Sequence, residues 1–211
     1  MHAINSRPAG GGLAAPLEPM GDAIDMQAGP APGRIDRTIV MVGLMGAGKT
    51  SIGKRLAQRL GVPFIDADHE IESAAGCTIE EIFERYGEAA FRDGERKIIQ
   101  RLLERPPHVL ATGGGAFMDA ETRARIKAAG VSVWLKADLD VLVRRVSRRS
   151  NRPLLKRGDP RDVLAKLMEQ RYPVYAEADI CIDSLDAPPE TTVDRVIEAI
   201  DRHQQHKAAP T

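Results

Sequence analysis

The sequence predicts an α/β fold in which helices cover both faces of an open, five-stranded parallel sheet. From Arg37 onward, short apolar runs rich in β-branched residues alternate with helical patterns, which is typical of repeated strand–helix units. The length of 211 residues suits one ordinary domain with appendages, and it is ample for a buried core. We therefore expect a single three-layer α/β/α domain.

The charge and composition of the chain exclude several classes of protein. Thirty Lys and Arg balance thirty Asp and Glu, so the chain lacks the basic excess that drives nonspecific binding to nucleic acids or anionic membranes. No apolar run approaches the roughly 20 residues of a membrane-spanning helix. The two cysteines, Cys77 and Cys181, stand in no metal-type pairing. We expect free thiols in or near the core of a cytoplasmic protein.

The first 36 residues differ from the rest of the chain. They are rich in Gly and Pro and show no sustained helical or strand period, so they bury too little apolar surface to offset the entropy of the chain. We predict a disordered extension over residues 1–36 and a single domain over 37–211. A partner-binding arm is the alternative for the extension.

Apolar runs and cap signals predict the elements of the domain. Ile52, Leu56 and Leu60 recur every four residues and Gly61 ends the pattern, as expected for an amphipathic helix with a glycine C-cap. The predicted strands are Thr38–Val42, Pro63–Ile65, Val109–Ala111, Val131–Leu135 and Ile180–Ile182. The predicted helices are Lys49–Leu60, one that starts with a capping box at Thr78, then Glu88–Leu103, Glu121–Ala129, Asp138–Arg148, Arg161–Tyr172 and Thr191–His203.

A glycine-rich loop at residues 43–51 carries the strongest functional signal. It reads GLMGAGKTS, follows an apolar strand and opens an amphipathic helix, which is the context that a P-loop requires. The loop amides and the helix N-terminus favour a bound phosphate, Lys49 would reach the β- and γ-phosphates, and the Thr50 hydroxyl would ligate Mg²⁺. We therefore expect binding of a nucleoside triphosphate. A P-loop alone does not distinguish a kinase from a GTPase, a motor or a passive binder.

The residues that follow the third predicted strand disfavour some of these classes of P-loop protein. Many P-loop proteins place an aspartate for Mg²⁺ there, whereas this chain continues into Thr112 and then Gly113, Gly114 and Gly115. The absence of that aspartate disfavours switch-type GTPases and motors. Three consecutive glycines after a strand indicate that a ligand approaches bare backbone. An ordinary flexible loop is the alternative.

Two acidic residues after the second strand are candidates for metal binding and acceptor chemistry. In an extended segment Asp66 and Asp68 would point to the same side, over the crevice where α/β sheets bind ligands. One carboxylate would hold Mg²⁺ through water, and the other would accept a hydrogen bond from an attacking hydroxyl. A solvated turn is the alternative.

Basic residues gather in one short segment. Seven of them lie within fourteen residues, and none of the aromatic residues that a nucleic-acid site would use for stacking is interleaved. We expect residues 151–160 to form a mobile loop that carries Arg152 to the transferring phosphate, with a solvated basic face as the alternative. The seven residues are Arg144, Arg145, Arg148, Arg149, Arg152, Lys156 and Arg157.

Together these motifs resemble the shikimate kinase family, from about residue 38 to about residue 201. The resemblance rests on six motifs in family order: the P-loop at 43–50, Asp-x-Asp at 66–68, Phe-Arg-x-x-Glu at 91–95, the glycines at 113–115, Arg-Pro-Leu at 152–154 and the late Arg171. It implies a P-loop kinase fold with a mobile lid around residues 146–160 and a substrate-binding region around residues 67–103. It also implies phosphorylation of the shikimate 3-hydroxyl by ATP, with Mg²⁺, in a monomer.

The resemblance also implies roles for individual residues. Asp68 would bind the ring hydroxyls and assist deprotonation, while Arg92 and Arg171 would hold the carboxylate beside Gly113, Gly114 and Gly115. Read without the resemblance, these two arginines are surface charges on helices. The expected catalytic residues are Asp68, Lys49 and Arg152. The expected ATP-binding residues are Gly46, Ala47, Gly48, Lys49, Thr50, Ser51, Arg145 and Arg152, and the expected Mg²⁺ ligands are Thr50 and Asp66.

Two other functions remain open at this point. A gluconate kinase or another small-molecule kinase would share the P-loop and the lid, although the combination of the other motifs disfavours it. A catalytically silent nucleotide-binding module is the second alternative, against which the intact Lys49, Asp68 and Arg152 argue.

Overall fold

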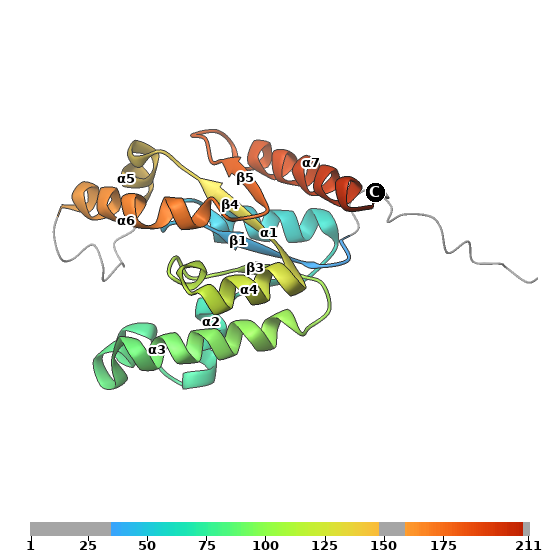
Figure 1. Ribbon diagram of the computed structural model, residues 1–211. Helices are drawn as coiled ribbons and strands as arrows, with labels where there is room; N and C mark the ends of the chain where they lie inside the picture. Colours follow the sequence, from blue (N-terminus) through green and yellow to red (C-terminus); the bar gives the residue numbers. More distant parts are fainter. Residues whose placement is uncertain (1–34, 148–158, 209–211) are drawn as a thin grey trace, which may run out of the picture.

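The computed structural model describes residues 35–147 and 159–208 of the chain. Its strands form one parallel sheet of five strands in the order β2-β3-β1-β4-β5 (Figure 1). The strands are β1 (Thr38–Val42), β2 (Phe64–Asp66), β3 (Val109–Ala111), β4 (Gly130–Lys136) and β5 (Ile180–Asp183). All five predicted strands are confirmed, and their ends shift by one residue or not at all.

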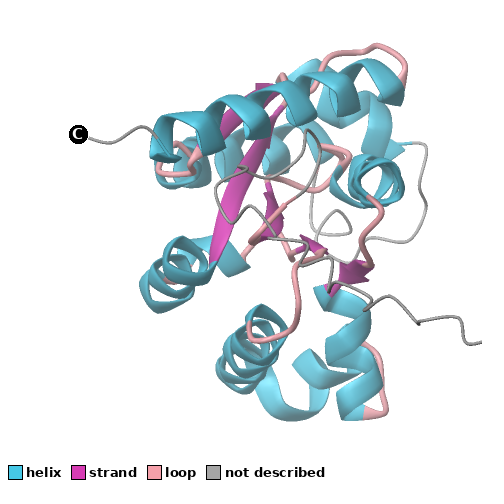
Figure 2. Cartoon of the chain, turned by 90° about the vertical axis from the view of Figure 1, so that its right-hand side faces the viewer, coloured by secondary structure: helices cyan, strands magenta, loops and turns pink. Residues whose placement is uncertain are grey.

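Helices cover both faces of this sheet, as the alternating pattern predicts. They are α1 (Lys49–Leu60), α2 (Ala67–Ala75), α3 (Ile79–Leu103), the 3₁₀ helix η1 (Ala116–Met118), α4 (Ala120–Ala129), α5 (Leu139–Ser147), α6 (Pro160–Tyr175) and α7 (Pro189–Ala208). Helices α1 and α7 pack together on one face, and α4 packs against β4 with α3 beside it. The right-handed crossovers from β1 and β3 run in opposite directions along the sheet, so they place α1 and α4 on opposite faces. Figure 2 shows the strands between the two helix layers.

The main core lies around the two central strands. Every residue of β1 is buried, and Gly130 to Leu135 of β4 are buried too. Such continuous burial is expected for parallel strands that are covered on both faces. A second, smaller cluster of buried residues lies between α2 and α3 and contains Ile71, Ile82 and Phe91.

The helices after β2 agree with the prediction except for α2, which was not predicted. Helix α3 consists of the two predicted helices, the capping-box helix and the one from Glu88, which meet at a kink at Gly87, where φ is 77° and ψ is 174°. Gly94 also lies within α3, but a Cβ there would meet no atom within 4 Å, so no close packing requires a glycine at this position. Cys77 and Cys181 are free thiols as predicted, but Cys181 is exposed on the edge strand β5 and does not fill the core.

No helix in the described part of the chain is long and apolar enough to cross a membrane.

Ile35, the first residue that the structure describes, is buried and belongs to the main core cluster. The packed domain therefore includes a residue that the sequence analysis assigned to the extension.

This burial predicts where the chain can be shortened. Removal of residues 1–33 should leave the free energy of unfolding within about 0.5 kcal/mol of the full chain. Removal of residues 1–35 also deletes Ile35, and loss of its buried side chain should cost about 1.5 to 3 kcal/mol. Urea unfolding of the three proteins measures both values. Equal stability of the two shortened proteins would show that Ile35 contributes nothing to the core.

Candidate active site

The P-loop joins the carboxyl end of β1 to the first turn of α1. Gly43 and Gly46 have φ angles of 141° and 84°, a region that side chains disfavour. A Cβ on Gly43 would lie 2.8 Å from the carbonyl oxygen of Leu135 in β4, and one on Gly46 would lie 3.0 Å from Val146 of α5. The loop is thus packed closely against the sheet, and the predicted strand–loop–helix unit is confirmed.

The Lys49 side chain lies along this loop. Its Nζ donates to the carbonyl oxygens of Gly43 at 2.8 Å and Leu44 at 3.1 Å. The Lys49 ammonium group therefore lies directly at the P-loop, whose backbone amides are suited to binding phosphates.

Thr50 and Asp66 meet at the carboxyl edge of the sheet. The Thr50 hydroxyl donates to Oδ2 of Asp66 at 3.1 Å. Mg²⁺ prefers oxygen ligands and is commonly held by one or two protein groups together with water and substrate phosphates. This hydroxyl and carboxylate therefore fit the protein's share of a Mg²⁺ site. Elsewhere in the described ranges no cluster of three or more His, Cys, Asp or Glu could hold a metal.

The expectation that Asp66 and Asp68 share one face of a strand is wrong. Asp66 ends β2 and caps α2, accepting a hydrogen bond from the backbone amide of Asp68 at 3.2 Å. Asp68 therefore lies in the first turn of α2, where a negative charge favours the helix. The two carboxylates belong to different elements, and Asp66 accepts a hydrogen bond from the Thr50 hydroxyl.

Asp68 instead faces the glycine loop after β3. A Cβ on Gly113 would lie 2.9 Å from Oδ1 of Asp68 and 2.9 Å from Oε1 of Glu95 in α3. The carboxylates of α2 and α3 thus converge on the same glycine. This position is open only because Gly113 has no side chain.

Two arginines flank the same loop from different helices. A Cβ on Gly115 would lie 2.2 Å from Nη1 of Arg92, and one on Gly114 would lie 3.3 Å from Nη1 of Arg171. Gly114 also lies close to the P-loop, since its Cβ position is 3.6 Å from the carbonyl oxygen of Gly43. The glycine loop therefore brings Arg92 of α3, Arg171 of α6 and the P-loop together.

Glu95 holds Arg92 in this place. Its buried carboxylate accepts from Nη1 of Arg92 at 3.1 Å, while exposed Glu88 pairs with Nη2. Burial raises the pKa of Glu95, the charge of Arg92 opposes this increase, and the nearby Asp68 adds to it. Glu95 was not among the predicted site residues, although its spacing of three residues from Arg92 places both on one helix face.

Arg145 lies against the P-loop from α5. It donates to the Ser184 hydroxyl at 2.9 Å and to the carbonyl oxygen of Leu185 at 2.7 Å, and its guanidinium lies 3.4 Å from the carbonyl oxygen of Gly46. Burial lowers the pKa of its guanidinium. Its expected place beside the adenine of ATP stays a prediction. Arg152 and most of the predicted lid lie outside the described residues.

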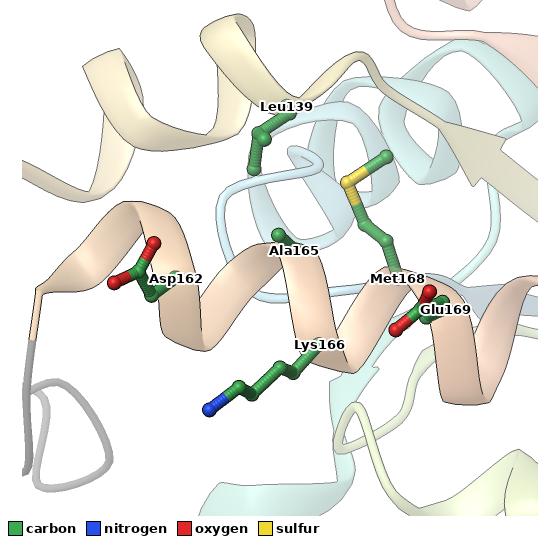
Figure 3. Close-up of a pocket in the computed structure, with 6 residues that line it drawn as sticks. All are labelled: Leu139, Asp162, Ala165, Lys166, Met168 and Glu169. Atoms are coloured by element: carbon green, nitrogen blue, oxygen red, sulfur yellow. The ribbon is translucent and has the colours of Figure 1, made fainter.

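A hollow of about 460 Å³ lies elsewhere, between α5 and α6. Figure 3 shows Leu139 of α5 facing the residues of α6 that line it. None of its lining residues belongs to the P-loop or to the glycine loop. The candidate active site is thus defined by its converging charged groups and bare backbone.

The sheet order, the P-loop and the charged groups at the carboxyl edge of the sheet define a P-loop kinase. The model of the shikimate kinase family matches residues 45–201, well over half of the chain. The chain belongs to the shikimate kinase family and has shikimate kinase activity, which places it in the shikimate pathway. The predicted family and enzyme class are therefore confirmed.

Individual shikimate kinases are similar in sequence to this chain. The chain is 60% identical over 181 residues to a shikimate kinase of Paramagnetospirillum magneticum, an alignment that covers 86% of this chain and 93% of the relative. It is 51% identical over 203 residues to one of Mesorhizobium japonicum, covering 96% and 93%. The latter alignment is long enough to extend into residues 1–34.

Solved structures show the same fold. A shikimate kinase from Acinetobacter baumannii, in complex with shikimate, is 39% identical with a TM-score of 0.75, and the match covers 79% of this chain and 93% of that one. A gluconokinase from Sinorhizobium meliloti is only 21% identical with a TM-score of 0.53. That second likeness shows the fold alone and gives no support to gluconate as the acceptor.

The contact between Gly115 and Arg92 predicts the effect of one added methyl group. Gly115→Ala should displace the guanidinium and raise the KM for shikimate by about tenfold, the loss of roughly one charge-assisted hydrogen bond. The KM for ATP should not change. Gly94→Ala is the matched control, because its Cβ would meet no atom within 4 Å. Unchanged acceptor KM in Gly115→Ala would show that Arg92 need not occupy this position.

Proposed function

We propose that the enzyme transfers the γ-phosphoryl group of ATP, with Mg²⁺, to the 3-hydroxyl of shikimate, giving shikimate 3-phosphate and ADP. The observation that carries this proposal is the close approach of the glycine loop to the P-loop, with two arginines and a carboxylate around it. Phosphoryl transfer depends mainly on positioning and charge stabilisation. An acceptor held at this loop lies next to the phosphate-binding backbone.

We assign the acceptor carboxylate to Arg92 and Arg171. Planar guanidinium groups suit a carboxylate because they donate two parallel hydrogen bonds. Gly113, Gly114 and Gly115 carry no side chain that would keep these guanidinium groups away from the loop. Shikimate carries one carboxylate and three ring hydroxyls, which these donors and Asp68 match.

We assign the acceptor hydroxyl to Asp68. Its carboxylate faces Gly113 beside Glu95, but Glu95 is buried whereas Asp68 is exposed. Asp68 is therefore the carboxylate better placed to accept a proton from a hydroxyl and to orient it toward the phosphate.

The remaining roles concern ATP. Lys49 would bind the phosphates, Arg145 would lie beside the adenine, and Arg152 would act on the transferring group. The amides of residues 46–51 would bind phosphate oxygens through Gly46, Ala47, Gly48, Lys49, Thr50 and Ser51. Thr50 and Asp66 would hold Mg²⁺, which neutralises phosphate charge when bound. The predicted monomer, the predicted cytoplasmic location and the predicted division into an extension (residues 1–36) and a domain (37–211) remain proposals, with the start of the domain moved to Ile35 because that residue is buried.

A coupled assay of ADP release tests the reaction. ADP should form with shikimate and Mg²⁺, should fall to background without an acceptor or with excess EDTA, and should not form with gluconate. Mass spectrometry and phosphorus NMR of the product should place one phosphate on the 3-hydroxyl. Turnover that is as fast with gluconate, or that needs no acceptor, would refute the proposal.

The two-arginine assignment predicts a selective loss of acceptor affinity. A hydrogen bond to a charged group contributes about 1.5 to 3 kcal/mol, so Arg92→Ala or Arg171→Ala should weaken shikimate binding by about tenfold to a hundredfold or more. ATP affinity should barely change. Arg125→Ala, which removes only an exposed ion pair with Glu121 on α4, is the control. Equal losses for shikimate and ATP would place these arginines outside an acceptor site.

A further inference from the structure

Tyr175, in the last turn of α6, has a buried hydroxyl that the proposed mechanism does not use. The residue is fully buried, and its ring lies 6.0 Å from that of Trp134 and 6.4 Å from that of Phe117. It follows Arg171 by four residues, so both side chains lie on one face of the helix. The sequence analysis did not single it out.

The hydroxyl of Tyr175 connects two parts of the acceptor site. It donates to the carbonyl oxygen of Gly114. A Cβ on Gly114 would lie 3.8 Å from this hydroxyl and 3.3 Å from Nη1 of Arg171, so the phenol and the guanidinium lie beside the same glycine. Burial raises the pKa of Tyr175, while the charge of Arg171 opposes this increase. The phenol consequently stays protonated at neutral pH and keeps the proton that it donates to Gly114.

The bond to Gly114 also orients the next peptide unit. In a planar trans peptide the carbonyl and the following N–H point in opposite directions. Because the Gly114 carbonyl points toward Tyr175, the N–H of Gly115 points away from it. Glycines have little intrinsic preference for one orientation, so an external hydrogen bond is the means of selecting one.

We propose that Tyr175 is a positioning residue that fixes the Arg171 guanidinium and the Gly114–Gly115 peptide in one arrangement and thereby sets the affinity for the acceptor. This inference rests on the proposed role of Arg171 in binding the acceptor carboxylate. In this role Tyr175 does not contact the acceptor. Its hydroxyl reduces the freedom of the Arg171 side chain and of the Gly114–Gly115 backbone, which binding of the acceptor would otherwise have to restrict.

Tyr172 offers a matched comparison within the same helix. It is partly buried, its ring lies 5.0 Å from that of Trp134, and its hydroxyl donates to the carbonyl oxygen of Ala137 instead of Gly114. Burial raises its pKa to about 12. Tyr172→Phe and Tyr175→Phe each remove one hydroxyl that donates to a backbone carbonyl, but only the second frees Arg171 and the glycine loop.

The experiment compares the two Tyr→Phe variants with the unchanged enzyme. Both should lose similar stability in urea unfolding. Tyr175→Phe alone should raise the KM and the calorimetric Kd for shikimate by about three- to tenfold, the value of one neutral hydrogen bond, while the KM for ATP stays constant. Identical shikimate affinity in the two variants would overturn the proposal, because the hydroxyl would then serve packing alone.

A double-mutant cycle with Arg171→Ala separates this inference from the proposed function. In the Arg171→Ala background, Tyr175→Phe should weaken shikimate binding by less than it does in the unchanged enzyme. The reason is that the Arg171 guanidinium, one of the two groups that Tyr175 positions, is then absent. Full additivity would overturn the coupling between the two residues. If Arg171→Ala weakens binding and Tyr175→Phe does not, only the positioning role fails. If Arg171→Ala itself leaves shikimate affinity unchanged, the assignment of the carboxylate fails as well.

Discussion

The absence of side chains at residues 113–115 is the constraint on which the site depends. Strand β3 lies between β2 and β1, and Ala111 pairs with both Asp66 and Met41. The ends of the three strands therefore lie side by side, and the loop after β3 approaches Asp68 at Gly113 and the P-loop at Gly114. Any side chain on this loop would occupy the space in which Asp68, Glu95 and the two arginines meet. The parallel strand order brings these groups close together, and the absence of side chains on the three glycines lets them approach the loop.

Features set by neighbouring residues could be predicted from the sequence. The P-loop, the C-cap at Gly61 and the capping box at Thr78 depend on residues within one turn of each other, and all three have the expected structure. Helix α2 was missed because Asp66–Ala67–Asp68 fits a strand end as well as a helix start. The capping bond from the Asp68 amide to Asp66 decides between them. Local pattern alone does not show which of two competing hydrogen bonds forms.

Pairings between distant residues could not be predicted in the same way. Glu95 and Tyr175 are polar groups whose burial is tolerated because each finds a partner, and those partners lie on the same helix and on the glycine loop. The spacing of three or four residues from an arginine was visible in the sequence. What was not visible is that both helix faces point at residues 113–115, because this follows from the strand order.

The two arginines belong to parts of the molecule with separate hydrophobic support. Arg92 follows Phe91, whose ring packs in the small cluster between α2 and α3, whereas Arg171 lies one turn before Tyr175 of the main core. Ile98 packs against both clusters. The small cluster contains only three buried apolar residues in the described chain, so it contributes far less burial energy than the main core. The separation between the two guanidinium groups consequently depends on weak packing on one side, and the ion pair with buried Glu95 on the same helix fixes the orientation of the Arg92 side chain.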